Sequence, residues 1–125
     1  MNNYMALQEQ AIRDYRIVMR PDSDCWKRTH AHVDQRMICK HTPKESYASL
    51  FLLLHEIGHI ETHKPGMKRS EQESEAVRWS IAKLRELGLP VKRRQLASYK
   101  KYVRMTYDRG VRRGLSKRIK SKLIM

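Results

Sequence analysis

Residues 42–63, TPKESYASLFLLLHEIGHIETH, are the stretch that decides the fold. Residues 42–45 match a capping box with proline at the first helical position, so we expect a helix to start there. The apolar run at residues 50–54 follows, and Lys64, Pro65 and Gly66 predict the end of the helix after His63. The sequence therefore predicts one long helix with a strongly apolar centre.

A metal-binding pattern lies inside this predicted helix. Residues 55–59 read HEIGH, which is the pattern H-E-x-x-H. Because residues four apart share one helix face, His55 and His59 can bind the same metal ion, and zinc accepts neutral nitrogen ligands in a tetrahedral site. Glu56 follows the first histidine and can act as the catalytic acid/base, taking a proton from water and passing it to a leaving amine.

A catalytic zinc site needs a third protein ligand. The extended pattern H-E-x-x-H-x-x-G-x-x-H fails, because Pro65 stands where its third histidine belongs. Among the glutamates downstream, Glu73 shares the apolar face of the next predicted helix, whereas Glu71 and Glu75 face solvent. Glu61 points about 160° away from His59 on the helix itself. Glu73 is therefore the predicted third ligand, and the alternative is a capping role at the third position of a second capping box.

The remaining segments predict a small α+β domain. Residues 4–19 favour a helix followed by a short strand, and residues 22–41 an antiparallel strand pair turning around residues 30–32. The capping box at residues 70–73 opens the helix of the third ligand, which ends at residues 87–90, LGLP. A basic helix over residues 92–109 should stop at Gly110. We expect an N-terminal helix, a small antiparallel sheet, the active-site helix, the third-ligand helix and basic C-terminal helices.

Charge is unevenly distributed along the chain. The formal net charge is +14, and residues 91–125 carry 13 basic side chains against Asp108 alone, a net of +12. Such a segment attracts nucleic acid, or it is a solvated tail that aids solubility. We expect a domain over residues 1–110 and a basic tail over residues 111–125. An apolar run of five residues is too short to cross a membrane, and the amino-terminal residues lack a signal-peptide pattern, so a cytoplasmic location is expected.

Other chemically capable residues have simpler interpretations. His63 would interact favourably with the carboxyl end of its helix. The cysteines and remaining histidines lack the close spacing of a second zinc site and favour ordinary strand residues with reduced thiols. Tyrosines of the basic segment could donate to a substrate oxyanion or simply pack. The cysteines and histidines of the first set are Cys25, His30, His32, Cys39 and His41. The tyrosines of the basic segment are Tyr99, Tyr102 and Tyr107.

Across residues 33–88 the chain resembles the ImmA/IrrE family of small zinc metallopeptidases. The family pattern H-E-[LI]-G-H, with a histidine four residues later, corresponds to HEIGHIETH at residues 55–63. Its E-x-x-A helix with a following aromatic corresponds to Glu73, Ala76 and Trp79, although Val77 replaces the usual Asn or Asp. The resemblance implies a minimal zincin-like fold, Zn²⁺ held by His55, His59 and Glu73, and Glu56 as the catalytic residue. It also implies a protein substrate, in characterised relatives a DNA-bound repressor.

Two functions follow as hypotheses. The first is a zinc-dependent metallopeptidase that hydrolyses a peptide bond in a specific intracellular protein. The second is a nucleic-acid-binding regulatory protein whose zinc site is structural or inactive, with residues 91–125 contacting the nucleic acid.

Overall fold

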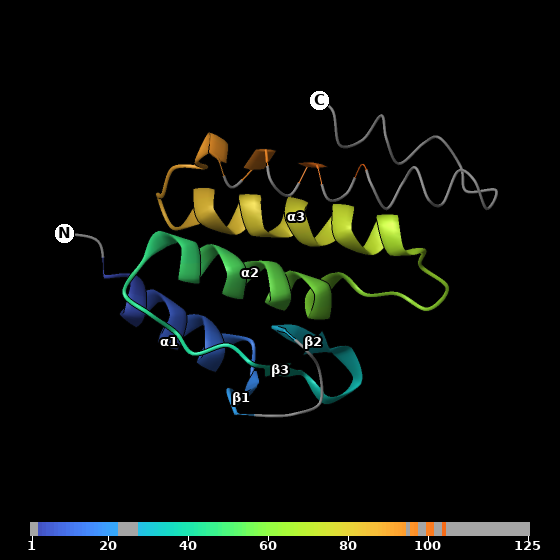
Figure 1. Cartoon of the computed structure of the whole chain (residues 1–125), viewed down its shortest axis with the longest axis horizontal. Coiled ribbons are helices and arrows are strands. Elements are labelled where there is room, and N and C mark those ends of the chain that lie inside the picture. The colour runs from blue at the N-terminus through green and yellow to red at the C-terminus, as the bar shows by residue number, and fades with distance from the viewer. Residues whose placement is uncertain (1–2, 23–27, 95, 98–99, 102–103, 105–125) are drawn as a thin grey trace.

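Helix α2 (Tyr47–Thr62) lies at the centre of the molecule, between helix α3 (Arg69–Glu86) on one side and helix α1 (Tyr4–Asp14) with a small sheet on the other (Figure 1). The structure is a computed structural model, and it describes residues 3–22, 28–94, 96–97, 100–101 and 104. Because α2 is covered on two sides, its apolar residues are buried around much of its circumference, and Leu50, Leu53, Leu54 and Ile57 are fully buried. Each such side chain contributes about 1.5–3 kcal/mol of hydrophobic stabilisation.

The sheet is mixed, which corrects the predicted antiparallel sheet. Its strands are β1 (Val18–Arg20), β2 (His30–His32) and β3 (Met37–Cys39), in the order β1-β3-β2. Strand β1 pairs in parallel with β3, and β2 pairs antiparallel with β3. The predicted order of a helix followed by a short strand over residues 4–19 is confirmed, and the α+β class is confirmed as well.

The turn between β2 and β3 lies further along the chain than the sequence indicated. Residues 30–32 form β2 itself, and the 3₁₀ turn η1 (Val33–Gln35) makes the reversal, with Arg36 in the left-handed conformation at φ 47°. Residues 30–32 are extended because they pair with β3 and because Ala31, opposite the fully buried Ile38, packs against the core. These are tertiary contacts that a local pattern does not contain.

Helix α2 begins at Tyr47 and not at the predicted capping box. Ser46 is the N-cap, and its hydroxyl accepts a hydrogen bond from the Ser49 backbone at 3.2 Å. The Glu45 carboxylate, which the box requires, instead accepts a hydrogen bond from the Met5 backbone at 3.1 Å. Gln8 also holds this segment, donating to the Lys44 carbonyl at 2.8 Å. The connection is therefore fixed by α1, and the helix starts one turn later.

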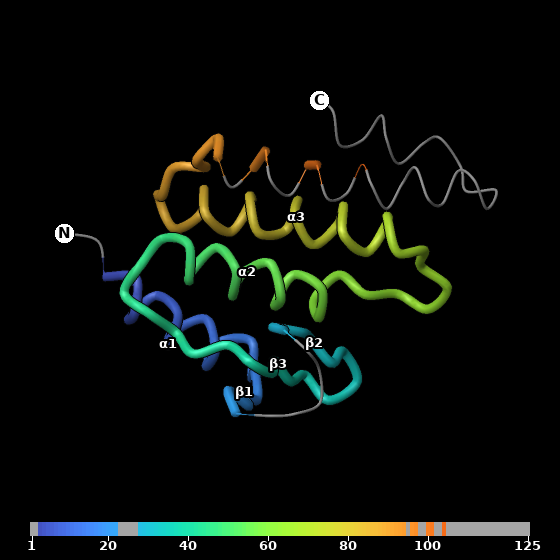
Figure 2. The backbone as a smooth tube through the Cα atoms, in the orientation of Figure 1, coloured from blue at the N-terminus to red at the C-terminus, as the bar shows by residue number. Residues whose placement is uncertain are grey.

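Helix α3 starts without the predicted second capping box. Lys68 is its N-cap and makes no side-chain cap hydrogen bond, and Ser70 lies buried inside the helix. The carboxyl end agrees with the sequence, because Gly88 adopts φ +73° and the Leu89 backbone donates to the Leu84 carbonyl at 2.9 Å. Helices α2 and α3 run side by side in opposite directions (Figure 2).

The structure describes part of the basic segment. Residues 93–94, 96–97, 100–101 and 104 are helical, in agreement with the start of the helix predicted over residues 92–109. The predicted stop at Gly110, Tyr99, Tyr102 and Tyr107, and the tail at residues 111–125 lie outside the described residues. No described helix combines the length and apolar character needed to cross a membrane.

Candidate metal centre

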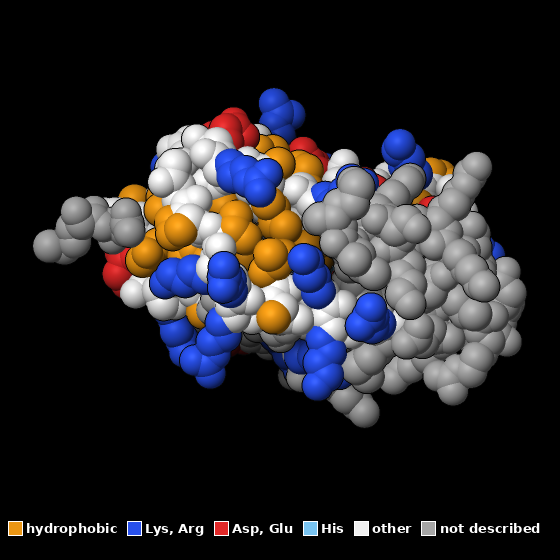
Figure 3. Space-filling view, turned by 90° about the horizontal axis from the view of Figure 1, so that it is seen from above, with side chains coloured by type: hydrophobic (Ala, Val, Ile, Leu, Met, Phe, Trp, Pro, Cys, Tyr) orange, Lys and Arg blue, Asp and Glu red, His pale blue; other side chains and the backbone are white. Residues whose placement is uncertain are grey.

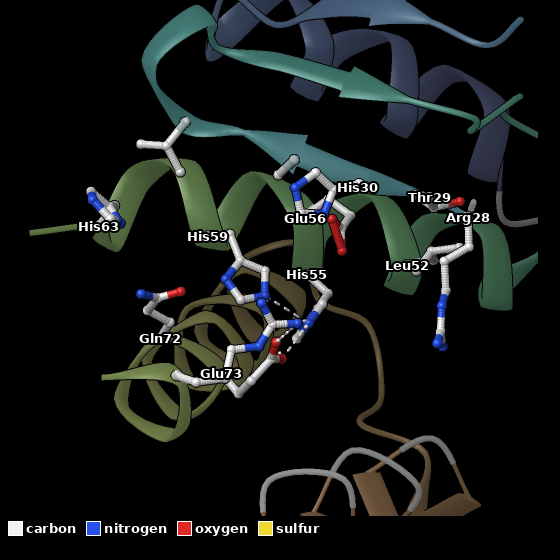
Figure 4. Close-up of a pocket in the computed structure, with 13 residues that line it drawn as sticks. Arg28, Thr29, His30, Leu52, His55, Glu56, His59, His63, Gln72 and Glu73 are labelled. Atoms are coloured by element: carbon white, nitrogen blue, oxygen red, sulfur yellow. Dashed lines mark hydrogen bonds and ion pairs between the residues drawn. The ribbon is translucent and has the colours of Figure 1, made fainter. Parts of the chain in front are cut away.

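The helix pair α2 and α3 brings the predicted ligands to one point. His55 and His59 lie one turn apart on α2, and Glu73 faces them from α3 (Figure 4). The His55 Nε2 atom lies 3.2 Å from His59 Nε2 and 3.2 Å from Glu73 Oε2. His59 Nε2 lies 3.4 Å from the same carboxylate oxygen. In the part of the chain that the structure describes, this is the one group of three side chains placed to hold a metal ion.

The spacing of these three atoms fits zinc. A tetrahedral zinc ion with bonds of about 2.0–2.1 Å separates its ligand atoms by about 3.3 Å. The three distances between His55, His59 and Glu73 are 3.2–3.4 Å. Two imidazole nitrogens and one carboxylate oxygen are also the donor set of many catalytic zinc sites. The residues present therefore suit a zinc ion in both geometry and chemistry.

The protonation states favour metal binding as well. Burial lowers the pKa of His55, so its imidazole is neutral, the form that binds a metal. Burial alone would raise the pKa of Glu73, but hydrogen bonds from His55 and His59 outweigh that effect and lower the pKa to about 2. The site thus offers a neutral nitrogen at His55 and an ionised oxygen at Glu73.

Glu56 lies beside this group without belonging to it. Its side chain is buried and lines the same cavity as the three ligands. Burial raises the pKa of Glu56 to about 7, and among the opposing effects is a hydrogen bond from the backbone of Ala31 in β2. A carboxyl group with this pKa exchanges protons near neutral pH, which suits a general acid or base.

Gly58 allows the two helices to approach each other, and sequence analysis did not single it out. A Cβ atom at Gly58 would lie 2.7 Å from the carbonyl oxygen of Ala76 in α3. Since Ala76 lies one turn after Glu73, this close contact sets how near the carboxylate comes to the histidines. The sequence does contain a signal for this contact. A glycine inside a helix costs about 1 kcal/mol of stability relative to alanine, so its presence at position 58 indicates a close contact with another segment.

The cavity beside the ligands has a volume of about 560 Å³ and lies between β2 and the helix pair. Its wall includes His30, Arg28 and Arg69 in addition to the predicted residues. His63 also lines the cavity but is not one of the three grouped ligands. No local sequence pattern marks the two arginines as site residues, because only the folded chain shows that they line the same cavity as the histidines.

The other glutamates considered as ligands, Glu61, Glu71 and Glu75, neither belong to this group nor line the cavity. Glu61 forms an ion pair with Arg36 at 2.8 Å, and Glu75 one with Arg78 at 3.8 Å. Of the second histidine and cysteine set, His32 Nε2 lies 3.6 Å from Cys39 Sγ, and His41 Nε2 lies 3.3 Å from Gln8 Oε1. These are pairwise contacts within the described fold, and Cys25 lies outside the described residues.

Comparison with known proteins gave no match to a family model, to a curated protein or to a solved structure.

Proposed function

We propose that the chain is a cytoplasmic, zincin-like zinc metallopeptidase that cleaves a specific intracellular protein, a nucleic-acid-bound regulator being the favoured substrate class. The observation that supports it most is the triangle of His55, His59 and Glu73, whose edges of 3.2–3.4 Å suit tetrahedral zinc. The resemblance of HEIGH at residues 55–59 to the ImmA/IrrE pattern supports the same proposal.

Each residue has a distinct role in this proposal. His55, His59 and Glu73 would hold the metal beside the cavity that all three line. When bound, zinc supplies Lewis acidity, which polarises a peptide carbonyl and lowers the pKa of water. Glu56 accepts a proton from the attacking water and delivers it to the nitrogen of the departing amine, so that the peptide bond is replaced by a carboxylate and an amine.

The test begins with metal content. Protein purified without a metal-affinity tag should contain about one zinc per chain by elemental analysis. Wild type and Glu56→Gln are then compared for new protein amino termini in the cells that express them. We expect the variant to keep its zinc and to lose the cleavage products, a reduction of at least about 100-fold. Full cleavage by Glu56→Gln would exclude the mechanism, and absence of zinc would exclude the site.

A second candidate function rests on charge. Residues 91–125 carry a net charge of +12. A segment with this positive charge attracts the phosphate backbone of nucleic acid. Seen from above α3, the surface shows more Lys and Arg than Asp and Glu side chains (Figure 3), and the described Arg93, Arg94 and Arg104 are exposed. Binding of the full chain to duplex DNA over a salt series tests this function. Affinity that falls steeply with salt supports it, and no binding at low salt removes it.

A further inference from the structure

Two arginine side chains, Arg28 and Arg69, line the cavity together with the three candidate metal ligands. Arg28, which Figure 4 labels, precedes β2, and Arg69 is the first residue of α3. The side chain of Arg69 is 57% exposed, and Arg28 is also exposed, so both guanidinium groups can meet a molecule that enters from solvent. They come from segments far apart in the sequence and converge on one cavity.

The acidic side chains of the cavity are buried, whereas the two arginines are exposed. The two lining acids are Glu56 and Glu73, which are 8% and 3% exposed and lie at the metal ligands. Arg69 Nη2 lies 3.5 Å from Glu73 Oε1, a long ion pair, while Glu73 Oε2 faces the histidines. Within the described residues, no acidic side chain forms an ion pair with Arg28.

We propose that Arg28 and Arg69 bind a carboxylate of the substrate, placing it beside the bond to be cleaved. The placement beside a bond to be cleaved rests on the proposed peptidase function. Arginine suits the task because its planar guanidinium can form two parallel hydrogen bonds with a carboxylate. The cavity volume of about 560 Å³ lies within the range of ligand sites. The carboxylate comes either from an Asp or Glu side chain or from a free carboxyl terminus.

Short alanine peptides distinguish these two sources. One peptide has a central Glu and blocked ends, a second has a central Gln and blocked ends, and a third has a central Gln and a free carboxyl terminus. Binding of each to zinc-loaded Glu56→Gln protein is measured by nuclear magnetic resonance titration at low salt, because this variant should not consume the peptide. The same titration on metal-free protein gives a readout that does not depend on zinc. Arg28→Gln and Arg69→Gln are tested in the same background, with Arg78→Gln as the matched control on the exposed part of α3.

We expect the Glu peptide, or the peptide with the free terminus, to bind about tenfold more tightly than the blocked Gln peptide. Either arginine substitution should reduce this preference to about twofold or less, and higher salt should weaken it. Arg78→Gln should leave it unchanged. If Arg69→Gln also loses zinc, then Arg28→Gln decides the result. Equal binding of all three peptides, or no binding of any, overturns the proposal.

The outcome separates this inference from the proposed function. A protein that holds zinc and cleaves protein substrates without any carboxylate preference retains the function and refutes the inference. A protein that binds carboxylate peptides through Arg28 and Arg69, but takes up no zinc, retains the inference as anion recognition and refutes the peptidase.

Discussion

Glu73 is the one carboxylate among the three candidate metal ligands. It is a buried carboxylate whose ionised form is held by two histidines, with a pKa of about 2. Glu73→Gln keeps the shape of the side chain and removes its charge. We expect zinc affinity to fall by more than about 100-fold, because even residues outside the ligand set cost 10–100-fold when changed. Competition with a chromophoric chelator measures this affinity.

Glu75→Gln is the matched control for that change. Glu75 lies on the same helix, and its side chain is exposed and pairs only weakly with Arg78 at 3.8 Å. Zinc affinity in this variant should equal that of the wild type. An equal loss of affinity in both variants would mean that Glu73 acts through the general charge of α3 and not as a ligand.

Glu56 gives the metal-free protein a pH-dependent stability. Burial raises its pKa from 4.5 to about 7. Between pH 4.5 and pH 7, the folded chain therefore keeps a proton on Glu56 that the unfolded chain has already released. The resulting stabilisation is complete below about pH 4.5 and is lost as the pH rises through 7. We expect wild type to lose about 2 kcal/mol more than Glu56→Gln between about pH 5 and pH 8. Urea unfolding with a chelator present measures the difference, and identical pH profiles would contradict it.

At the scale of elements, the contact between α2 and α3 depends on Gly58. In an ordinary helix a change from glycine to alanine stabilises by about 1 kcal/mol. Here the added carbon would lie 2.7 Å from the Ala76 carbonyl oxygen, so the helices must separate. We expect Gly58→Ala to destabilise the protein by about 1–3 kcal/mol and to weaken zinc binding as well. Thermal unfolding and chelator competition measure the two effects.

Gly88→Ala provides the comparison. Gly88 has φ +73°, and a Cβ atom added there would meet no atom within 4 Å, so alanine costs about 1–2 kcal/mol of backbone strain without a steric contact. Its zinc affinity should stay at the wild-type value. If Gly58→Ala also left zinc affinity unchanged, the close contact of α2 and α3 would not position Glu73.

Two substitutions to alanine test which residue caps the start of α2. Ser46 caps the helix through its hydroxyl, whereas Thr42 is an exposed residue outside it. Ser46→Ala should reduce the free energy of unfolding by about 1 kcal/mol. Thr42→Ala should change it by less than about 0.5 kcal/mol. Chemical denaturation of both variants measures these changes. A larger loss of stability for Thr42→Ala than for Ser46→Ala would favour the cap predicted from the sequence over the Ser46 cap.

Local signals made several elements predictable. The end of α3 at Glu86 follows from Gly88, and the body of α2 follows from its apolar run, because both depend on residues close together in the chain. The start of α2 was not predictable, since the Glu45 carboxylate is taken by the Met5 backbone. The parallel pairing of β1 with β3 likewise depends on contacts between distant segments.

The candidate site divides in the same way. The spacing of His55 and His59 follows from helix geometry alone, and the face shared by Glu73 follows from helical periodicity. The distance between the helices and the contact of β2 with Glu56 do not follow from any local pattern. Arg28 and Arg69 therefore had no local pattern that marked them as cavity residues. Features that follow from the periodicity of one helix could be predicted, and the contacts made by residues outside these patterns could not.

At the scale of the whole molecule, metal binding should couple to folding. The three ligands lie on two packed helices, so an ion that binds only the folded chain stabilises it in proportion to the logarithm of its free concentration. A free zinc concentration about 100 times the dissociation constant adds about 2.7 kcal/mol. Unfolding of the full chain with zinc and with a chelator tests this coupling. Equal stability under both conditions would contradict it.

The position of all three ligands within residues 55–73 also has a kinetic consequence. These residues comprise the second half of α2, one short connection and the start of α3, so the contacts that build the triangle of candidate ligands are local in the chain. Local contacts form early in folding, because they close short loops. Glu56 meets the Ala31 backbone only after β2 has docked. We therefore expect zinc to accelerate refolding by trapping the helical hairpin, and a newly made chain to bind zinc before Glu56 has reached its final surroundings.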